Sequence, residues 1–495
     1  MAAPHSPGPA DPQPQRGGVT GGVRGISTQT DSRVQGPGPR LSKVNLFTLL
    51  SLWMELFPKK KSQEQDNGSA GDTGLVVVQD QRVLGLHCSG SVHAGQVAVL
   101  RHGSRLKGCD LYFSRKPCST CLKMIINAGV NRISYWPADA EITLLSDEER
   151  AAEEARLDAQ AAERLKSNSR AHICVMLQPL ANSMLQFVEE TSRNGDFLGR
   201  MAADDQSRDI GELFMEERLK HWDNFSRRFC IEDAEQHRKL LEKMGLENFS
   251  TDPYFITLRQ HMKDLIKVLA SVAASVPVQE HEYGFYETET TPTKDSTLPQ
   301  EVVRHCIIQA ALLAYRTEDP KVGVGTVIWA EDKWQSECDG MGTMYLVGCG
   351  YNAYPAGSKY AEFPQMDTRQ EERCNRKYRY IIHAEQNALT FRSTEVRGQE
   401  KTMLFVTKCP CDECVPLICG AGIKQIYTTD LDSGKDKHDI SYMRFSQLSQ
   451  VQKFIWQKSP AARSASEKSR PPLANGHLKH RREEDTDCHN KRQRT

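Results

Sequence analysis

The chain carries the same pattern of residues twice: a His-Ala pair and, further along, two cysteines in the order Pro-Cys-x-x-Cys. The first copy begins at His93 and the second at His383. Around each copy, short apolar runs alternate with segments of helical spacing, in the same order. Alternating strands and helices of this length imply a sheet with helices packed on its faces. The repeat therefore predicts two units of one α/β fold.

The elements of both units follow from the spacing of apolar residues. In the first unit we expect strands at 73–78, 82–88, 108–114 and 131–136, and helices at 93–102 and 118–129. In the second unit we expect helices at 302–316, 381–392 and 411–422, and strands at 324–330, 345–351, 401–407 and 424–430.

Polar, low-hydropathy sequence surrounds these two units. A mean hydropathy of −0.56 and a hydrophobic share of 38% are low for one compact body of 495 residues, so part of the chain is expected to be disordered. We expect a disordered N-terminal tail at 1–42, an apolar segment and basic linker at 43–73, the first unit at 74–184, a helical connector and polar linker at 185–297, the second unit at 298–458, and a disordered basic tail at 459–495.

Charge and cysteine content exclude several classes of protein. Lys and Arg together number 64, as do Asp and Glu, so the formal net charge is zero. This balance argues against a chain built as a whole to coat a polynucleotide. Neither a membrane span nor a secretory signal is expected, because no apolar run is long enough and the N-terminus lacks a basic region followed by an apolar one. Fifteen cysteines without an export signal indicate a reducing compartment, in which clustered cysteines serve metal binding or catalysis.

The second copy of the pattern contains the ligands for a zinc ion. Cys411 and Cys414, two residues apart at the start of a helix, can both face one tetrahedral zinc. His383 supplies a third ligand and leaves the fourth position open for water. Zinc lowers the pKa of that water toward neutrality, which makes hydroxide available as a nucleophile. Glu385 is placed to move the proton without ligating the metal.

A closed structural zinc site is the alternative. It requires a fourth protein ligand, and Cys409 is the nearest candidate. A site with three cysteines and one histidine would be inert. The glutamate beside His383 favours the open site, because His-x-Glu followed by Pro-Cys-x-x-Cys is the signature of zinc nucleobase deaminases.

The second unit resembles deoxycytidylate (dCMP) deaminases beyond these zinc residues. Segments 316–328, 347–355, 377–389 and 409–427 follow that family's order and approximate spacing. The resemblance covers about residues 300–445. It implies cytidine-deaminase-like α/β/α sandwiches, each a mixed sheet flanked by helices, with Zn²⁺ at the N-termini of two helices. It also implies that His383, Cys411 and Cys414 are ligands, Glu385 is the proton shuttle and Asn352 contacts the substrate.

Two segments depart from that family. Lys321 follows Asp319-Pro320 where the family usually has Asn, and residues 427–439 are only loosely similar. Both places are expected to lie near the sugar or phosphate of a substrate. The choice between nucleoside, monophosphate and triphosphate therefore stays open, as does the choice between ribose and deoxyribose.

The first unit has Gly95 where the second has its glutamate. His93, Cys118 and Cys121 keep a zinc-ligand pattern, but glycine has no ionisable group with which to move a proton. We therefore predict a pseudo-deaminase over 74–184 that can hold a non-catalytic zinc. The alternative is that a nearby acid, such as Glu141 or Glu148, replaces the missing one; nothing in the sequence supports it.

These patterns predict a zinc-dependent hydrolase that converts the cytosine base of free cytidine or deoxycytidine nucleosides or nucleotides to the uracil product and ammonia. One alternative is a polynucleotide cytidine deaminase, which would call for a basic, aromatic-lined groove. Aromatic residues are only 7% of the chain, and we do not expect nucleic acid as a partner. The other alternative is a catalytically silent zinc-binding scaffold, against which the intact Glu385 argues. The resemblance also implies a homo-oligomer.

Two short motifs predict shuttling between cytoplasm and nucleus by way of nuclear transport receptors. A bipartite import signal is expected at Lys479, Arg481, Arg482, Lys491, Arg492 and Arg494. An export signal is expected at Leu46, Leu49, Leu52 and Met54, which a helix could present on one face. The alternatives are a solvated tail of mixed charge and a core helix that packs on the first unit.

Overall fold

A computed structural model describes residues 40–59, 72–146, 148–205, 209–277, 282–288, 297–319, 323–332, 339–355, 372, 374, 376–437 and 439–468. The predicted import signal at 479–494 lies outside these ranges, as do Lys321 and most of both predicted tails. Within the described ranges, none of the helices has the length and apolar composition needed to cross a membrane.

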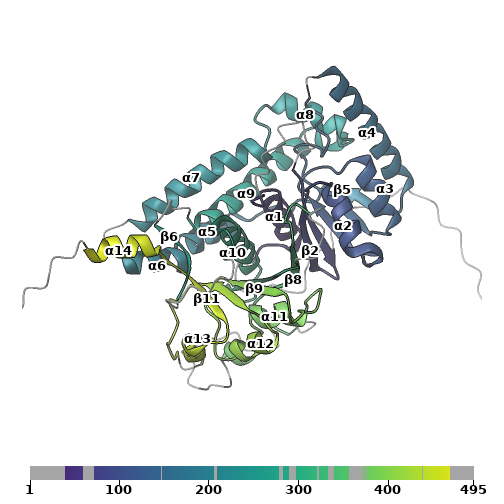
Figure 1. Ribbon diagram of the computed structural model, residues 1–495. Coiled ribbons are helices and arrows are strands. Elements are labelled where there is room, and N and C mark those ends of the chain that lie inside the picture. Colours follow the sequence, from purple (N-terminus) through teal and green to yellow (C-terminus); the bar gives the residue numbers. More distant parts are fainter. Residues whose placement is uncertain are drawn as a thin grey trace, which may run out of the picture.

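The first domain is built on a five-stranded sheet. Its strands are β1 (Gly74–Gln79), β2 (Arg82–Cys88), β3 (Asp110–Phe113), β4 (Arg132–Tyr135) and β5 (His172–Cys174), and its first helices are α1 (Lys43–Glu55), α2 (Ala94–His102) and α3 (Ser119–Asn127). The order across the sheet is β2-β1-β3-β4-β5 (Figure 1). β1 pairs antiparallel with β2 and β3, while β4 and β5 continue parallel to β3. The sheet is therefore mixed, as predicted.

Helices cover both faces of this sheet. Gly74 and Val77 of β1 point to opposite faces, because side chains alternate along a strand. A Cβ at Gly74 would lie 2.0 Å from the Ser51 carbonyl oxygen of α1. Gly85 is paired with Val77, and a Cβ there would lie 2.5 Å from the ring of His102 in α2. α1 therefore covers one face, and α2 covers the other with its neighbour α3.

The second domain repeats this arrangement. Its sheet contains β7 (Gly325–Glu331), β8 (Met344–Tyr351), β9 (Lys401–Val406), β10 (Gln425–Thr428), β11 (Gln452–Lys458) and, at one edge, β6 (Tyr283–Glu287). Its helices are α10 (Gln300–Ala314), α11 (Ala384–Thr390), α12 (Cys414–Gly420) and α13 (Met443–Gln447). The strand order β8-β7-β9-β10-β11-β6 is that of the first sheet with β6 added. The predicted fold class, two α/β/α sandwiches, is confirmed.

The first helix of each domain approaches its sheet in the same way. A Cβ at Gly325, the first residue of β7, would lie 1.8 Å from the Ala310 carbonyl oxygen of α10. This close contact matches that of Gly74, the first residue of β1, with α1. A glycine at the start of the strand next to the sheet edge thus lets the backbone of the first helix lie directly on it in both domains.

Helices fill most of the predicted connector at 185–297. They are α5 (Asn182–Arg193), α6 (Asp196–Asp204), α7 (Ile210–Phe229), α8 (Ala234–Lys243) and α9 (Tyr254–Ala274), preceded by α4 (Glu149–Asn168), which packs on α3. Figure 1 shows α7 running along one edge of the molecule, and α9 packs against it on the inner side.

Two stretches of the chain differ from the predicted boundaries. β6 lies inside the predicted connector but pairs antiparallel with β11, so the second sheet takes its edge strand from there. The predicted C-terminal tail begins with a helix, α14 (Pro460–Lys468). The hydroxyl of Ser459 accepts a bond from the Ala462 amide at 3.2 Å and so caps the start of this helix.

The segment in which we predicted an export signal is buried as α1. Leu46, Leu49, Leu52 and Met54 are each at most 1% exposed. In the folded chain they are not presented to a transport receptor, so the structure contradicts the predicted export signal. Apolar residues occupy every side of this helix because every side is buried, whereas the sequence pattern was interpreted as a single exposed face. The alternative of a core helix is what the structure shows.

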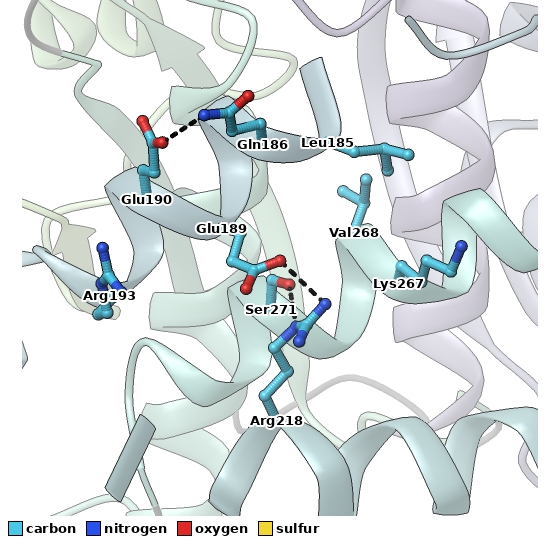
Figure 2. A pocket seen from close by; sticks show the side chains of 9 residues that line it. All are labelled: Leu185, Gln186, Glu189, Glu190, Arg193, Arg218, Lys267, Val268 and Ser271. Carbon is cyan, nitrogen blue, oxygen red and sulfur yellow. Dashed lines mark hydrogen bonds and ion pairs between the residues drawn. The ribbon is translucent and has the colours of Figure 1, made fainter. Parts of the chain in front are cut away.

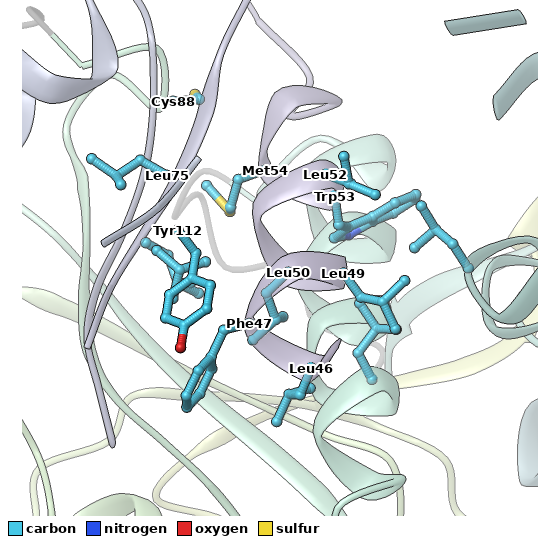
Figure 3. Packing of buried hydrophobic residues seen from close by; sticks show 14 of the residues in the cluster. Leu46, Phe47, Leu49, Leu50, Leu52, Trp53, Met54, Leu75, Cys88 and Tyr112 are labelled. Atoms are coloured by element: carbon cyan, nitrogen blue, oxygen red, sulfur yellow. The ribbon is translucent and has the colours of Figure 1, made fainter. Parts of the chain in front are cut away.

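α1 packs between the two domains. Figure 3 shows its side chains extending to both sides, with Phe47 directed toward Tyr112 of the first sheet and Trp53 directed away from that sheet. The rings of Phe47 and Tyr112 are 5.2 Å apart between centroids. The Trp53 ring stacks on His305 of α10 at 4.6 Å and donates from Nε1 to the His305 carbonyl at 3.0 Å. One helix therefore supplies core side chains to both domains.

A buried carboxylate joins α1 to the first domain and to the connector. The Glu55 side chain has no exposed surface and lies 2.9 Å from Arg115 and 2.9 Å from Arg228 of α7. The Ser114 hydroxyl donates to the same carboxylate at 2.5 Å. The buried Glu55 carboxylate thus connects three segments that are far apart in the sequence.

Candidate active site and metal centres

The predicted ligands of the second domain lie together at the ends of two helices. His383 is the N-cap residue of α11, and its amide donates to the Gln386 side chain at 2.8 Å. Its Nδ1 lies 3.2 Å from the Cys411 sulfur and 3.3 Å from the Cys414 sulfur. One nitrogen and two sulfurs within 4.8 Å of one another match the ligand types that zinc takes.

The two thiols of this group differ in acidity, and the bond with Cys411 raises the pKa of Cys414. Bonds from Cys414 and His383 lower the pKa of Cys411 to about 4, although burial opposes the shift. A lowered pKa favours the thiolate, which is the form that binds zinc. Cys409, the alternative fourth ligand, is buried nearby but does not belong to the group of ligand atoms found in the described part of the chain. Three protein ligands with an open fourth position are typical of a catalytic centre.

Glu385 lies in the first turn of α11 and is only 4% exposed. Burial raises the pKa of its carboxyl to about 7, with a further contribution from Cys411. A carboxyl group with a pKa near neutrality can both accept and donate a proton. Glu385 is not one of the grouped ligand atoms. It therefore has the position and the chemistry predicted for a proton shuttle.

The ligand group faces a cavity of about 570 Å³, which is within the range of small-molecule sites. Asn352, predicted to contact the substrate, lines this cavity just after β8. Its Oδ1 accepts bonds from the Val324 amide at 2.9 Å and from the Thr317 hydroxyl at 2.7 Å. These bonds hold the side chain in place beside His383 and Glu385.

The lysines at the cavity are paired with carboxylates. Lys408 lies 3.1 Å from Asp432 and 3.1 Å from Asp196, the first residue of connector helix α6. Lys437 lies 2.5 Å from the same Asp432. Sequence reasoning missed these residues, and Asp196 above all, because only the tertiary fold brings the connector to this wall. The sequence carried no local signal for it.

A buried ion pair supports the same cavity from the segment before His383. Lys377, in the 3₁₀ turn η5 (Lys377–Arg379), lies 2.5 Å from Asp319. The two side chains are 1% and 3% exposed. A pair this buried is costly to break, because either partner alone would be an uncompensated charge. Asp319 is the residue before the segment in which the sequence departs from dCMP deaminases.

The predicted ligands of the first domain also lie together, with one addition. His93 is the N-cap residue of α2 and Cys118 that of α3, and His93 Nδ1 lies 3.2 Å from the Cys118 sulfur. Cys121 completes the predicted set. Glu141, for which the sequence gave no support, joins it: its Oε2 lies 3.0 Å from His93 Nδ1, and all four ligand atoms lie within 4.8 Å of one another.

Gly95 leaves no room for the glutamate that the second domain has. A Cβ at Gly95 would lie 2.9 Å from Cβ and 3.1 Å from Sγ of Cys121. The position therefore lacks both an acid and the space for one, which agrees with the predicted loss of the proton shuttle. The other candidate acid, Glu148, is not part of the ligand group that the described residues form.

Sequence comparison shows which known proteins this chain resembles. A family model described as the cytidine and deoxycytidylate deaminase zinc-binding region matches residues 49–136 and 299–429. Cytidine and dCMP deaminase domain-containing protein 1 of Danio rerio is 66% identical over 439 residues, which are 88% of this chain and 93% of that protein. The chain belongs to the cytidine and deoxycytidylate deaminase family. The first match begins inside α1, in agreement with the packing of that helix on the first sheet.

More distant members of the family resemble only part of the chain. Deoxycytidylate deaminase of Homo sapiens is 34% identical over 140 residues, which are 28% of this chain and 70% of that enzyme. Among solved structures, dCMP deaminase from the cyanophage S-TIM5 in its apo form is 21% identical and covers 32% of this chain and 98% of its own, with a TM-score of 0.21.

Gly95→Ala tests whether the candidate metal site of the first domain has room for a side chain at position 95. The added methyl group meets Cys121, so we expect zinc content to fall from about two toward one per chain, together with a lower melting temperature. Turnover per folded chain should not change. Zinc analysis, thermal unfolding and activity measure the three effects. Gly398→Ala is the matched control, because a Cβ there meets nothing within 4 Å; equal results for both variants would contradict the prediction.

A second cavity, of about 500 Å³, lies among the connector helices α5, α7 and α9 (Figure 2). Several of its polar side chains are bonded to one another. Arg218 lies 3.0 Å from Glu189 and donates to the Ser271 hydroxyl at 3.1 Å, and Gln186 donates to Glu190 at 2.7 Å. No group of metal ligands lies there among the described residues. We assign it no chemistry.

Proposed function

We propose that the second domain catalyses hydrolytic deamination of the cytosine base in free cytidine or deoxycytidine nucleosides or nucleotides. The products are the corresponding uracil compound and ammonia. The observation that carries this proposal is the placement of Glu385 beside an open group of three zinc ligands at the cavity. Membership of the cytidine and deoxycytidylate deaminase family supports the same chemistry.

The residues present fit a zinc ion, held by His383, Cys411 and Cys414. Zinc, when bound, would supply the Lewis acid that makes water a good nucleophile at neutral pH. Glu385 takes a proton from the water that attacks C4 of the base. It delivers that proton to ring nitrogen N3, then takes the second proton from the new C4 hydroxyl and passes it to the amino group, which leaves as ammonia. Burial of Glu385 limits exchange of these protons with bulk solvent.

The cavity surroundings support a free nucleoside or nucleotide rather than a polymer. Lys408 and Lys437 are neutralised by Asp196 and Asp432, so they do not form an unpaired basic stripe along which a strand could run. Tyr378 and Tyr442 line the cavity and offer aromatic surface to one base.

The test is a panel of cytidine, deoxycytidine, dCMP, dCTP and single-stranded DNA, offered to the zinc-loaded full-length chain. Ammonia and the uracil product are measured for each. We expect turnover on one or more of the free compounds and none on the DNA. Turnover on the DNA alone, or on no compound by a chain that holds its zinc, would overturn the proposal. Self-association and nuclear import through the basic clusters at 479–494 remain predictions.

A further inference from the structure

We propose that Glu141 is the fourth ligand of a closed metal site in the first domain, together with His93, Cys118 and Cys121. This inference concerns the domain that lacks the shuttle glutamate, so it stands independently of the function proposed for the second domain. The site would hold zinc permanently, with no position left for water or substrate. It would thus be a structural metal site whose histidine and cysteines follow the pattern of a catalytic site.

The position of the carboxylate supports ligation. Glu141 Oε2 lies 3.0 Å from His93 Nδ1, which is the same nitrogen that faces the Cys118 sulfur. Zinc bonds of about 2.0–2.3 Å place the ligand atoms of a tetrahedral site roughly 3.3–3.8 Å apart. The four ligand atoms, all within 4.8 Å of one another, need only a small adjustment to reach that geometry. A substitute proton shuttle would instead lie beside the metal ligands and leave one position open.

The backbone brings Glu141 to this place. The Glu141 amide donates to the Lys116 carbonyl at 2.8 Å, and the Lys116 amide donates to the Asp139 carbonyl at 3.0 Å. This pairing lays the segment that follows β4 against the residues that precede Cys118. The Cys118 amide in turn donates to Glu141 Oε2 at 3.1 Å. The carboxylate is therefore fixed at the N-terminus of α3, where the cysteine ligands begin.

The other oxygen of the carboxylate gives an independent indication of a ligand. The Glu141 side chain has no exposed surface, and its Oε1 is buried without a hydrogen-bond partner among the described residues. A buried acceptor left unsatisfied costs about 1–3 kcal/mol. Coordination of a cation in which Oε1 takes part, alone or together with Oε2, would remove that cost.

The second domain shows what an open site looks like on the same fold. There Asp432, one of the carboxylates that follow β10, is turned to Lys408 and Lys437 and does not belong to the ligand group. The acid of that site comes from α11 instead. The two domains thus differ in a reciprocal way: one has a glutamate at the shuttle position and three ligands, the other a glycine there and four.

Cobalt substitution tests this inference on the full-length chain without relying on activity. With Co²⁺ in both sites, azide should change the visible spectrum of the cobalt in the second domain only, because only that site has an exchangeable position. In Glu141→Ala, azide should change the spectra of both cobalt ions. Glu148→Ala is the control and should behave like the wild type. Azide binding by both cobalt ions of the wild-type chain would overturn the proposal.

Zinc release to a chromogenic chelator provides the second measurement. We expect one slow and one faster phase from the wild-type chain, with the slow phase at least about tenfold faster in Glu141→Ala. Glu141→Gln keeps the shape of the side chain but ligates weakly, so it should also release zinc faster and guards against misfolding of the alanine variant. Release at the wild-type rate from either folded variant counts against the proposal. If both variants misfold, the azide titration of the wild-type chain still decides.

Discussion

Glu385→Gln in the full-length chain is expected to lower kcat by about 10²–10⁴-fold while both domains keep their zinc. The amide has almost the shape of the carboxylate, so the neighbouring helix and the three ligands should stay in place. It cannot accept the proton of the attacking water or deliver it to the departing amino group. The loss should therefore appear in kcat, with little change in substrate affinity.

Three measurements together check this expectation: kcat on the best compound of the panel, zinc per chain and melting temperature. Glu395→Gln is the matched control, since it removes an exposed carboxylate of the same domain. It should keep the wild-type kcat. If Glu385→Gln also kept it, the second domain would not be the catalytic centre. A loss of zinc along with activity would show instead that Glu385 maintains the metal site.

Glu55→Ala is expected to lower the free energy of unfolding by about 3–5 kcal/mol. The carboxylate is fully buried and lies within hydrogen-bond distance of Arg115 and Arg228. Without it, the two guanidinium groups lose the carboxylate they share and keep only Asp139, 3.5 Å from Arg115, and Asp72, 3.7 Å from Arg228. Because these residues belong to α1, to the loop after β3 and to α7, the variant loosens the junction of three segments at once.

Urea unfolding, followed by far-ultraviolet circular dichroism, measures this change. The control is Glu153→Ala, which removes a carboxylate from an exposed i,i+3 pair with Arg156 on α4. Exposed pairs of this kind contribute little, so the control should unfold at the wild-type urea concentration. Equal midpoints for the two variants would show that the Glu55 cluster does not stabilise the junction.

Sequence patterns were sufficient where the deciding residues are neighbours in the chain. The hairpin β1–β2 and the strands β3 and β4 could be predicted, because each is a short apolar run bounded by turn residues. The histidine and cysteines of both candidate metal sites could be predicted for a similar reason: a helix start holds two cysteines at a fixed spacing. These local features fixed the fold class and the candidate site of the second domain.

Patterns failed where partners are distant in the chain. Glu141 reaches the first metal site only because its backbone pairs with Lys116, and no spacing rule connects the two. β6 lies just before a polar, Thr-rich stretch, and its partner β11 is the last strand of the same sheet along the chain. α1 was misinterpreted for another reason: leucines spaced along a helix look alike whether one side or every side is covered.

The position of α1 also bears on how such a chain can change over evolutionary time. Trp53 and Met54 belong to the first copy but pack on His305 and Gln309 of the second. A deletion that discarded the copy without the shuttle glutamate would strip away part of the other copy's interior and leave α10 uncovered. The contacts of α1 therefore make the fold of the second copy depend on the presence of the first.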